Sequence, residues 1–207
     1  MKLNSTVRSI DLSYNKIDEQ GALFISEFLK SNSTITSINL SDNAIEAKGA
    51  LSILETLNTF PTAITSIDVS CNPINPYVSQ LFPILLEKQT TIQFPRSYLG
   101  DPAVGYISQF LKSNSTVTTV DIRNNQVGPE GAGYIAECLK SNSTLTSINL
   151  RDNRIKHEGA LVILHALKSN TTLKSIDLNW NSIDSSAFQL AVDAQYSGRD
   201  NIPSISF

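Results

Sequence analysis

Few side chains in this sequence could act as catalytic groups or metal ligands. The chain has two cysteines, Cys71 and Cys138, and two histidines, His157 and His165. Their positions show no metal-ligand spacing, and no glycine-rich loop of the phosphate-binding kind follows a predicted strand. A catalytic nucleophile needs a base beside it, and this small set offers no convergent pair. We therefore predict that the chain is not an enzyme and uses no metal, no cofactor and no small-molecule substrate.

Composition and charge exclude several further classes. The 207 residues include 16 Lys and Arg against 19 Asp and Glu, for a net charge of −3 at pH 7. That balance does not indicate a nucleic-acid-binding protein, because binding to phosphates requires an excess of basic residues. A hydrophobic fraction of 41% excludes a disordered chain. The sequence does not open on a classical signal peptide and holds no apolar stretch of about 18 residues, so we predict no membrane association and a cytoplasmic location.

A repeat of 28 or 29 residues runs along most of the sequence. Its pattern is apolar, two variable, apolar, one variable, apolar, two variable, Asn, one variable, apolar. Complete copies contain Asn15, Asn43, Asn72, Asn125, Asn153 and Asn181. A weaker copy has Ser97 in the Asn position, and a truncated copy ends at Phe207. Two-residue alternation predicts one strand per copy. The strands are expected near 7–12, 35–40, 64–69, 90–94, 117–122, 145–150, 173–178 and 202–207.

A helical pattern follows the Asn in each copy. In residues 21–29 the apolar stripe expected to face the core is Leu23, Phe24 or Ile25, Phe28 and Leu29. Four copies carry a glycine six residues after the Asn, namely Gly21, Gly49, Gly131 and Gly159. A glycine that recurs at one position predicts either tight packing of helix against strand or a backbone angle that a side chain disfavours.

Each helix is expected to end in a near-identical phrase, Lys-Ser-Asn-Ser/Thr-Thr, at 30–34, 112–116, 140–144 and 168–172. The asparagine suits a left-handed helix cap, and the same tripeptide also matches the signal for Asn-linked glycosylation. Capping is the favoured interpretation, because the phrase recurs at one structural position and no secretion signal precedes it.

This strand–loop–helix unit resembles the leucine-rich repeat, in its ribonuclease-inhibitor-like class of 28–29 residues. The resemblance covers residues 3–207 and implies a right-handed α/β solenoid, a horseshoe with a parallel sheet on the concave face and helices on the convex face. It also implies that the repeated Asn is buried and bonds the backbone of neighbouring turns. One unit cannot bury its apolar face alone, so stacking supplies the core. We predict a single domain, 1–207, of about eight repeats and one continuous sheet.

The third and fourth units depart from this pattern. Prolines crowd the region at Pro73, Pro76, Pro83 and Pro95, and the step from Asn72 to Ser97 is three residues short. Two interpretations remain for residues 71–100: a drifted repeat that still stacks, or a change of curvature that shapes a ligand site. Neither end carries an obvious polar cap, so we expect a fragment of a longer array.

The repeat also assigns positions to the side chains named first. Cys71 is expected at the concave edge, Cys138 in the core beside a helix, His157 in a connecting loop and His165 on an exposed helix face. The cysteines lie in different layers and are not expected to form a disulfide. One concave column alternates carboxylates with neutral side chains, which keeps like charges apart; it reads Asp11, Asn39, Asp68, Gln93, Asp121, Asn149, Asp177 and Ser206.

Arginines gather beside the only tryptophan on the same predicted face. Trp and Arg are enriched at binding hot spots, and Arg can pair bidentately with carboxylates. The alternative is that these arginines neutralise Asp121, Asp152 and Asp177 within the sheet. The candidate partner-binding residues are Trp180, Asn179, Arg151, Arg123, Arg96 and Asp152, with Tyr14 and Arg8 at the far end.

We therefore predict a non-catalytic module that binds a protein partner on its concave face. The resemblance leaves two alternatives. One is a GTPase-activating or other enzyme-regulating protein. The other is a sensor or recognition fragment of a larger protein, since the repeats are similar to those of nucleotide-binding receptors and of bacterial effectors, which are exported into a host cell.

Overall fold

Every repeat forms one short strand with an apolar residue at its centre. The computed structural model describes residues 6–73, 90–197 and 202–207. The strands are β1 (Ser9–Asp11), β2 (Ser37–Asn39), β3 (Ser66–Asp68), β4 (Thr91–Gln93), β5 (Thr119–Asp121), β6 (Ser147–Asn149), β7 (Ser175–Asp177) and β8 (Ser204–Ser206). All eight lie within the predicted ranges. The polar residues on either side of each central Ile or Val point away from the core, as two-residue alternation requires.

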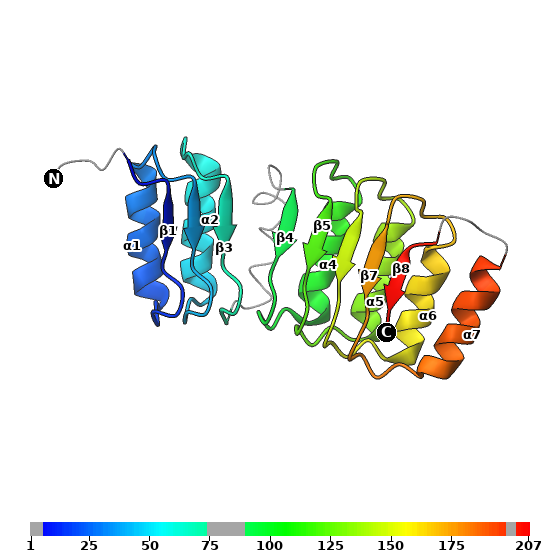
Figure 1. The fold of residues 1–207 in the computed structure, drawn as a ribbon. Coiled ribbons are helices and arrows are strands. Elements are labelled where there is room, and N and C mark those ends of the chain that lie inside the picture. The colour runs from blue at the N-terminus through cyan, green and yellow to red at the C-terminus, as the bar shows by residue number, and fades with distance from the viewer. Residues whose placement is uncertain (1–5, 74–89, 198–201) are drawn as a thin grey trace.

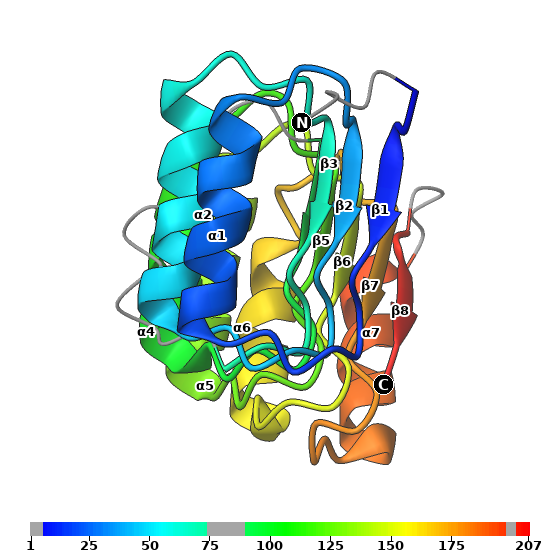
Figure 2. The ribbon, with the colours of Figure 1, turned by 90° about the vertical axis from the view of Figure 1, so that its left-hand side faces the viewer.

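The helices form a second layer that lies behind the strands (Figure 1 and Figure 2). They are α1 (Glu19–Lys30), α2 (Ala47–Thr59), α4 (Gly100–Leu111), α5 (Pro129–Leu139), α6 (Lys156–Ala166) and α7 (Ser185–Tyr196). The core fills the space between the layers, and Ile38, Ile53, Ile92 and Ile163 are almost completely buried in it. Parallel strands alternating with helices confirm the predicted α/β solenoid. None of the described helices has the length and apolar character needed to cross a bilayer.

The strands form two parallel sheets rather than one. The first has the order β1-β2-β3 and the second β4-β5-β6-β7-β8, each in register from repeat to repeat. The expected uninterrupted sheet is therefore wrong at the boundary between β3 and β4. There the backbone N–H of Cys71 donates to the carbonyl of Pro95 at 2.9 Å. In the other repeats the residue equivalent to Pro95 donates its N–H to a side chain of its own strand, as Ser70 does to Asp68 at 2.9 Å, so Pro95 removes no bond between strands. Pro76 and Pro83 lie outside the described residues.

The repeated asparagines connect successive turns of the solenoid. The Oδ1 of Asn125 accepts hydrogen bonds from the backbone of Ser97 at 2.9 Å and Leu99 at 3.2 Å. Its Nδ2 donates to the carbonyl oxygens of Phe94 at 2.6 Å and Arg123 at 3.1 Å. Each such side chain replaces the water that buried peptide groups would otherwise need.

Burial of these asparagines follows their place in the stack. Asn72, Asn125, Asn153 and Asn181 are buried, as the resemblance implies, and Asn43 is partly buried. Asn15 is exposed, so that expectation is wrong for the first copy. It lies beyond β1, which pairs only with β2 among the described strands, and no described turn covers its outer side.

The network of asparagines is interrupted at Ser97. This side chain is fully buried, and its Oγ donates to the carbonyl of Pro95 at 3.1 Å within its own repeat. Serine is too short to reach the preceding repeat as Asn does elsewhere. The interruption coincides with the boundary between the two sheets.

The asparagines of the helix-end phrase act as caps through their side chains. The Oδ1 of Asn142 accepts from the backbone N–H groups of Thr144 at 3.0 Å and Leu145 at 2.7 Å, and its Nδ2 donates to Leu111 at 2.6 Å. Asn170 repeats this arrangement. Asn142 and Asn170 thus cap the helix of the preceding repeat, whereas the helices that they follow have Lys140 and Leu167 at their own C-caps. The expected left-handed conformation is wrong, because none of these asparagines has a positive φ. Their amide groups are occupied by the fold itself.

Three of the recurring glycines, Gly49, Gly131 and Gly159, mark close contacts with the preceding helix, whereas Gly21 lies against Ile17 of its own repeat. A Cβ at Gly49 would lie 2.7 Å from the Cβ of Ala22, and one at Gly159 would lie 2.9 Å from the Cβ of Ala132. None of the four glycines has a positive φ, so the requirement is space. For Gly49, Gly131 and Gly159, the expected packing of helix against strand is corrected to packing of helix against helix.

We expect Gly159→Ala to lower the free energy of unfolding by about 1–2 kcal/mol, because the added methyl group is forced against a fixed backbone. The nearest atoms to it include the Cα of Pro129 at 3.2 Å. Gly133, in the interior of α5, is a matched control with nothing within 4 Å of an added Cβ. Gly133→Ala should raise the free energy of unfolding by about 0.5–1 kcal/mol through helix propensity. Urea denaturation measures both, and the same sign for the two variants would contradict this account.

One helix face differs from the predicted stripe. Phe24 and Phe28 of α1 are 68% and 46% exposed, whereas Ala22 and Leu29 are completely buried. Ile25 packs against the core, so of the two alternatives the inward residue is Ile25.

Candidate functional site

The turn after each strand directs one side chain to the same edge of the strand face, the surface formed by the outward side chains of β1–β8. The residue before each repeated Asn or Ser has a φ between 53° and 62°; these residues are Tyr14, Asp42, Cys71, Arg96, Asn124, Asp152 and Trp180. Residues other than glycine rarely adopt this left-handed conformation. Here it lets the following Asn turn into the core while its neighbour remains at the surface.

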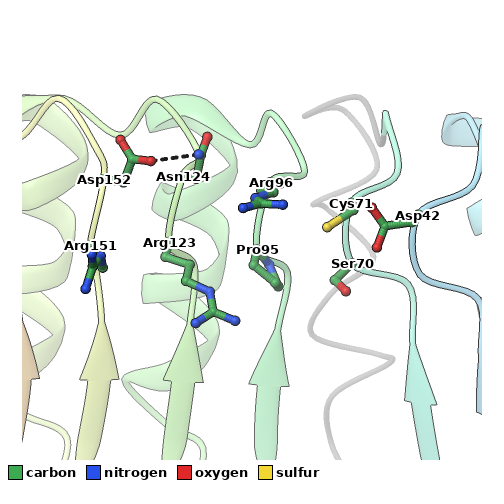
Figure 3. A pocket seen from close by; sticks show the side chains of 9 residues that line it. All are labelled: Asp42, Ser70, Cys71, Pro95, Arg96, Arg123, Asn124, Arg151 and Asp152. Atoms are coloured by element: carbon green, nitrogen blue, oxygen red, sulfur yellow. Dashed lines mark hydrogen bonds between the residues drawn. The ribbon is translucent and has the colours of Figure 1, made fainter. Parts of the chain in front are cut away.

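A pocket of about 500 Å³ lies at this edge, where the two sheets meet. Figure 3 shows its nine lining residues, which are Asp42, Ser70, Cys71, Pro95, Arg96, Arg123, Asn124, Arg151 and Asp152. Four of them, the three arginines and Asp152, belong to the predicted site. The pocket exists where β3 and β4 fail to pair, so the irregular repeat contributes directly to its shape.

Three arginines give the pocket its positive charge, and each has a different environment. The Nε of Arg123 lies 3.5 Å from Oδ2 of Asp121, and the guanidinium of Arg151 lies 5.7 Å from the ring centre of Trp180. Arg96 forms no ion pair with any residue in 6–73, 90–197 or 202–207. Within these ranges, the guanidinium groups of Arg96 and Arg151 therefore have no carboxylate as an ion-pair partner.

The carboxylates proposed as neutralising groups have other partners. Oδ2 of Asp152 accepts from Nδ2 of Asn124 at 2.8 Å, as Figure 3 shows. Asp177 accepts from both nitrogens of Asn179, at 2.9 and 2.8 Å. Burial raises the pKa of Asp121, with Arg123 acting in the opposite direction. Neutralisation within the sheet therefore describes Arg123 only.

The remaining predicted residues lie outside the pocket. Trp180 is 73% exposed beside Arg151, and Asn179 is partly buried. Tyr14 is 77% exposed at the far end, and the charge of Asp42 raises the pKa of its hydroxyl. Arg8 donates to the carbonyl of Thr34 at 3.1 Å. The structure thus brings together Arg96, Arg123, Arg151 and Asp152, places Trp180 next to them, and leaves Tyr14 and Arg8 apart.

The pocket also contains residues that were not predicted as site residues. They follow the ends of β2, β3, β4 and β5 and are Asp42, Ser70, Cys71, Pro95 and Asn124. Pro95 lies in the short, proline-rich third step of the repeat, whereas Asp42 and Ser70 occupy regular positions of the repeat and carry no signal of their own.

The cysteines and histidines lie in separate places. Cys71 is partly exposed in the pocket, and Cys138 is buried in α5, as predicted; both are free thiols. His165 is exposed on α6, as predicted, whereas His157 lies in the first turn of α6 rather than in a loop and meets Phe188 edge-on. Within the described part of the chain, no three His, Cys, Asp or Glu side chains are grouped to hold a metal ion.

The sequence matches the Leucine Rich repeat family over residues 3–26, 31–54, 113–136, 141–164 and 169–187, which together are more than half of the chain. The chain belongs to the leucine-rich repeat family. The matched segments flank the irregular third and fourth repeats, where the pocket of this leucine-rich repeat chain lies.

Solved structures that share the fold of this leucine-rich repeat chain include a leiomodin and an internalin. A structure titled leiomodin-1 actin-binding site 2 has a TM-score of 0.57 at 22% identity, over 62% of this chain and 75% of the other. An internalin (inlF) from Listeria monocytogenes has a TM-score of 0.58 at 15% identity, over 98% of this chain and 55% of the other. Among curated protein sequences, none matches significantly.

Cys71 provides a chemical probe of the pocket in this leucine-rich repeat chain. Burial and the nearby charge of Asp42 raise the pKa of its thiol. Because the thiolate is the reacting form, alkylation by iodoacetamide should reach half-maximal rate above the ordinary thiol pKa of about 8.5. Asp42→Asn should move that midpoint to lower pH, since the substitution removes a negative charge that opposes ionisation.

Cys138 is the internal control for this measurement. The residue is 2% exposed, and burial raises the pKa of its thiol to about 11. Peptide mass spectrometry should show alkylation of Cys71 in the folded chain and of Cys138 only after unfolding. Equal labelling of the two thiols in the folded chain would contradict this placement.

Proposed function

We propose that this chain is a non-catalytic protein-interaction module that binds a protein partner on its strand face, the predicted concave side. The observation that carries the proposal is the pocket formed by Arg96, Arg123 and Arg151 beside an exposed Trp180. Trp and Arg at the centre of an interface contribute more binding energy than other residue types. The leiomodin structure, whose title names an actin-binding site, supports a protein as the class of partner.

The scaffold suits binding with little loss of conformational freedom. Backbone ladders join β4 to β8 without interruption, and buried asparagines bond each turn beneath the site to the next. Side chains on such a scaffold already lie near their bound positions, so less entropy is lost on association. The described residues around the pocket offer binding groups, and the raised pKa of the Cys71 thiol beside Asp42 disfavours the reactive thiolate.

Trp180→Ala combined with Arg151→Ala should abolish most partner binding. Affinity capture followed by quantitative mass spectrometry should show proteins whose recovery falls at least about tenfold, as expected when two hot-spot residues are removed. Val162→Ser with Leu190→Ser is the matched control, because these side chains are 48% and 70% exposed on helices α6 and α7. Loss of the captured protein with the helix-face variant, but not with the strand-face variant, would place the interface on the helices.

A further inference from the structure

Two arginines stand side by side on neighbouring strands of the second sheet. Asp121 of β5 is in register with Asn149 of β6, so Arg123 and Arg151, each two residues further along, occupy equivalent positions. The backbone ladder continues past them, with Asn124 N–H donating to the carbonyl of Arg151 at 2.9 Å. Like charges at adjacent positions of a sheet destabilise it. The pair of arginines therefore costs stability, and positions at which a sequence gives up stability in this way are often functional.

Arg96 adds a third positive charge on the other side of Arg123. Its backbone N–H donates to the carbonyl of Arg123 at 3.0 Å, which fixes the two residues on adjacent turns. The three arginines line one pocket together with the carboxylates of Asp42 and Asp152, which leaves the pocket an excess of one positive charge. Neighbouring strands lie about 4.8 Å apart, a spacing at which two arginines can bind the same carboxylate or two carboxylates of adjacent residues.

The column below the arginines limits how much negative charge a ligand can carry. Asp121 and Asp177 lie two residues before Arg123 and Asn179 on the same face, and Asp68 occupies the equivalent position in β3. A polyanion such as nucleic acid would meet these carboxylates along its length. A recessed pocket also fits the flat surface of an anionic membrane poorly. The charge pattern favours a short acidic segment of a protein.

Trp180 supplies the apolar end of the same surface. It occupies in β7's turn the position that Arg96 occupies in β4's turn, three strand intervals away. Three intervals are about 14 Å, which an extended peptide covers in about four residues at 3.3 Å each. The ring is 73% exposed and is contacted by the guanidinium of Arg151 at 5.7 Å, so it is held in place while most of its surface remains open.

We propose that the pocket binds a short acidic segment of the partner protein, with one or two carboxylates on Arg96, Arg123 and Arg151 and an apolar side chain on Trp180, about four residues from a carboxylate at Arg96. This inference rests on the proposed function and adds the chemistry of the partner. The bound segment lies across the strands, from β4 to β7.

Phage display of random dodecapeptides on the immobilised full chain tests the proposal. The wild type should enrich peptides with Asp or Glu followed or preceded, about three to five residues away, by an aromatic or aliphatic residue. The best peptide is then titrated by fluorescence polarisation. Arg96→Gln with Arg123→Gln should weaken its binding at least about tenfold, because charge-assisted hydrogen bonds are lost.

Matched variants separate the arginine geometry from net charge and from folding. Lys112→Gln with Lys140→Gln removes the same total charge at the ends of α4 and α5, and binding should change less than about twofold. Arg123→Lys keeps the charge but loses the planar fork, so it should weaken binding by about threefold or more. This milder variant and the loss of affinity with added NaCl provide the test if the double variant fails to fold.

The outcomes distinguish this inference from the proposed function. Selected peptides without acidic enrichment, no selection at all, or acidic peptides retained by the double arginine variant would each overturn the inference. If the selected peptides lose binding to the Trp180→Ala variant, the strand face remains the interface. If their binding to that variant is unchanged, both proposals fail. Phosphatidylserine vesicles provide a further arm, and vesicle binding that depends on Arg96 and Arg123 would favour a membrane instead.

Discussion

Asn125→Ala is expected to lower the free energy of unfolding by about 3–4 kcal/mol. The substitution removes a buried amide that bonds four backbone groups in two turns, including the N–H of Ser97 and the carbonyl of Phe94. Asn125 is completely buried, so these backbone groups cannot form hydrogen bonds with water when their partner is lost. Each buried polar group left unsatisfied costs about 1–3 kcal/mol, and the cavity adds to that cost.

The first copy of the repeat contains the matched control. Asn15 is exposed, and its side chain donates to the carbonyl of Ser13 at 2.8 Å. Asn15→Ala should therefore cost less than about 1 kcal/mol, because solvent satisfies what the side chain releases. Urea denaturation followed by circular dichroism measures both variants. Equal losses of stability would show that the inter-turn bonds of Asn125 do not hold the stack together.

Periodicity predicted the architecture because the repeat specifies the same packing many times. Two-residue alternation around residues such as Ile38 and Ile148 placed every strand, and the 28-residue step predicted parallel pairing of like positions. Periodicity predicted the inward face of each helix less precisely. Phe24 and Ile25 are neighbours, and both fit a helical stripe that is wider than one residue. Only the structure shows that Ile25 packs against the core whereas Phe24 is exposed.

The candidate site could be predicted only in part. Alternation placed Arg123 and Arg151 on the strand face, and their equivalent positions followed from the repeat. The pocket itself depends on the break between β3 and β4, where Ser97 cannot replace the bonds of an asparagine. The loss of these hydrogen bonds is compatible with an irregular repeat that still stacks and with a sheet that is interrupted. The sequence pattern alone does not distinguish between the two.

The second large effect concerns the repeats beside Trp180. Phe188→Ala should lower the free energy of unfolding by about 3–5 kcal/mol, since a completely buried aromatic side chain leaves a cavity. Phe188 lies in α7, and its ring meets those of Phe207 at 4.8 Å and His157 at 6.3 Å, both edge-on. It therefore joins α7 to the residue that follows β8 and to the start of α6.

The same substitution at an exposed site isolates the contribution of burial. Phe24 is 68% exposed on α1, and Phe24→Ala should change the free energy of unfolding by less than about 0.5 kcal/mol. Chemical denaturation compares the two, with hydrogen exchange of the amides in α6 and α7 reporting where structure is lost. Because β7 carries the turn of Trp180, loosening of this end should also expose the turn to solvent. A stability loss confined to α1, or similar effects of the two substitutions, would contradict the assignment of Phe188 to the core that supports the binding face.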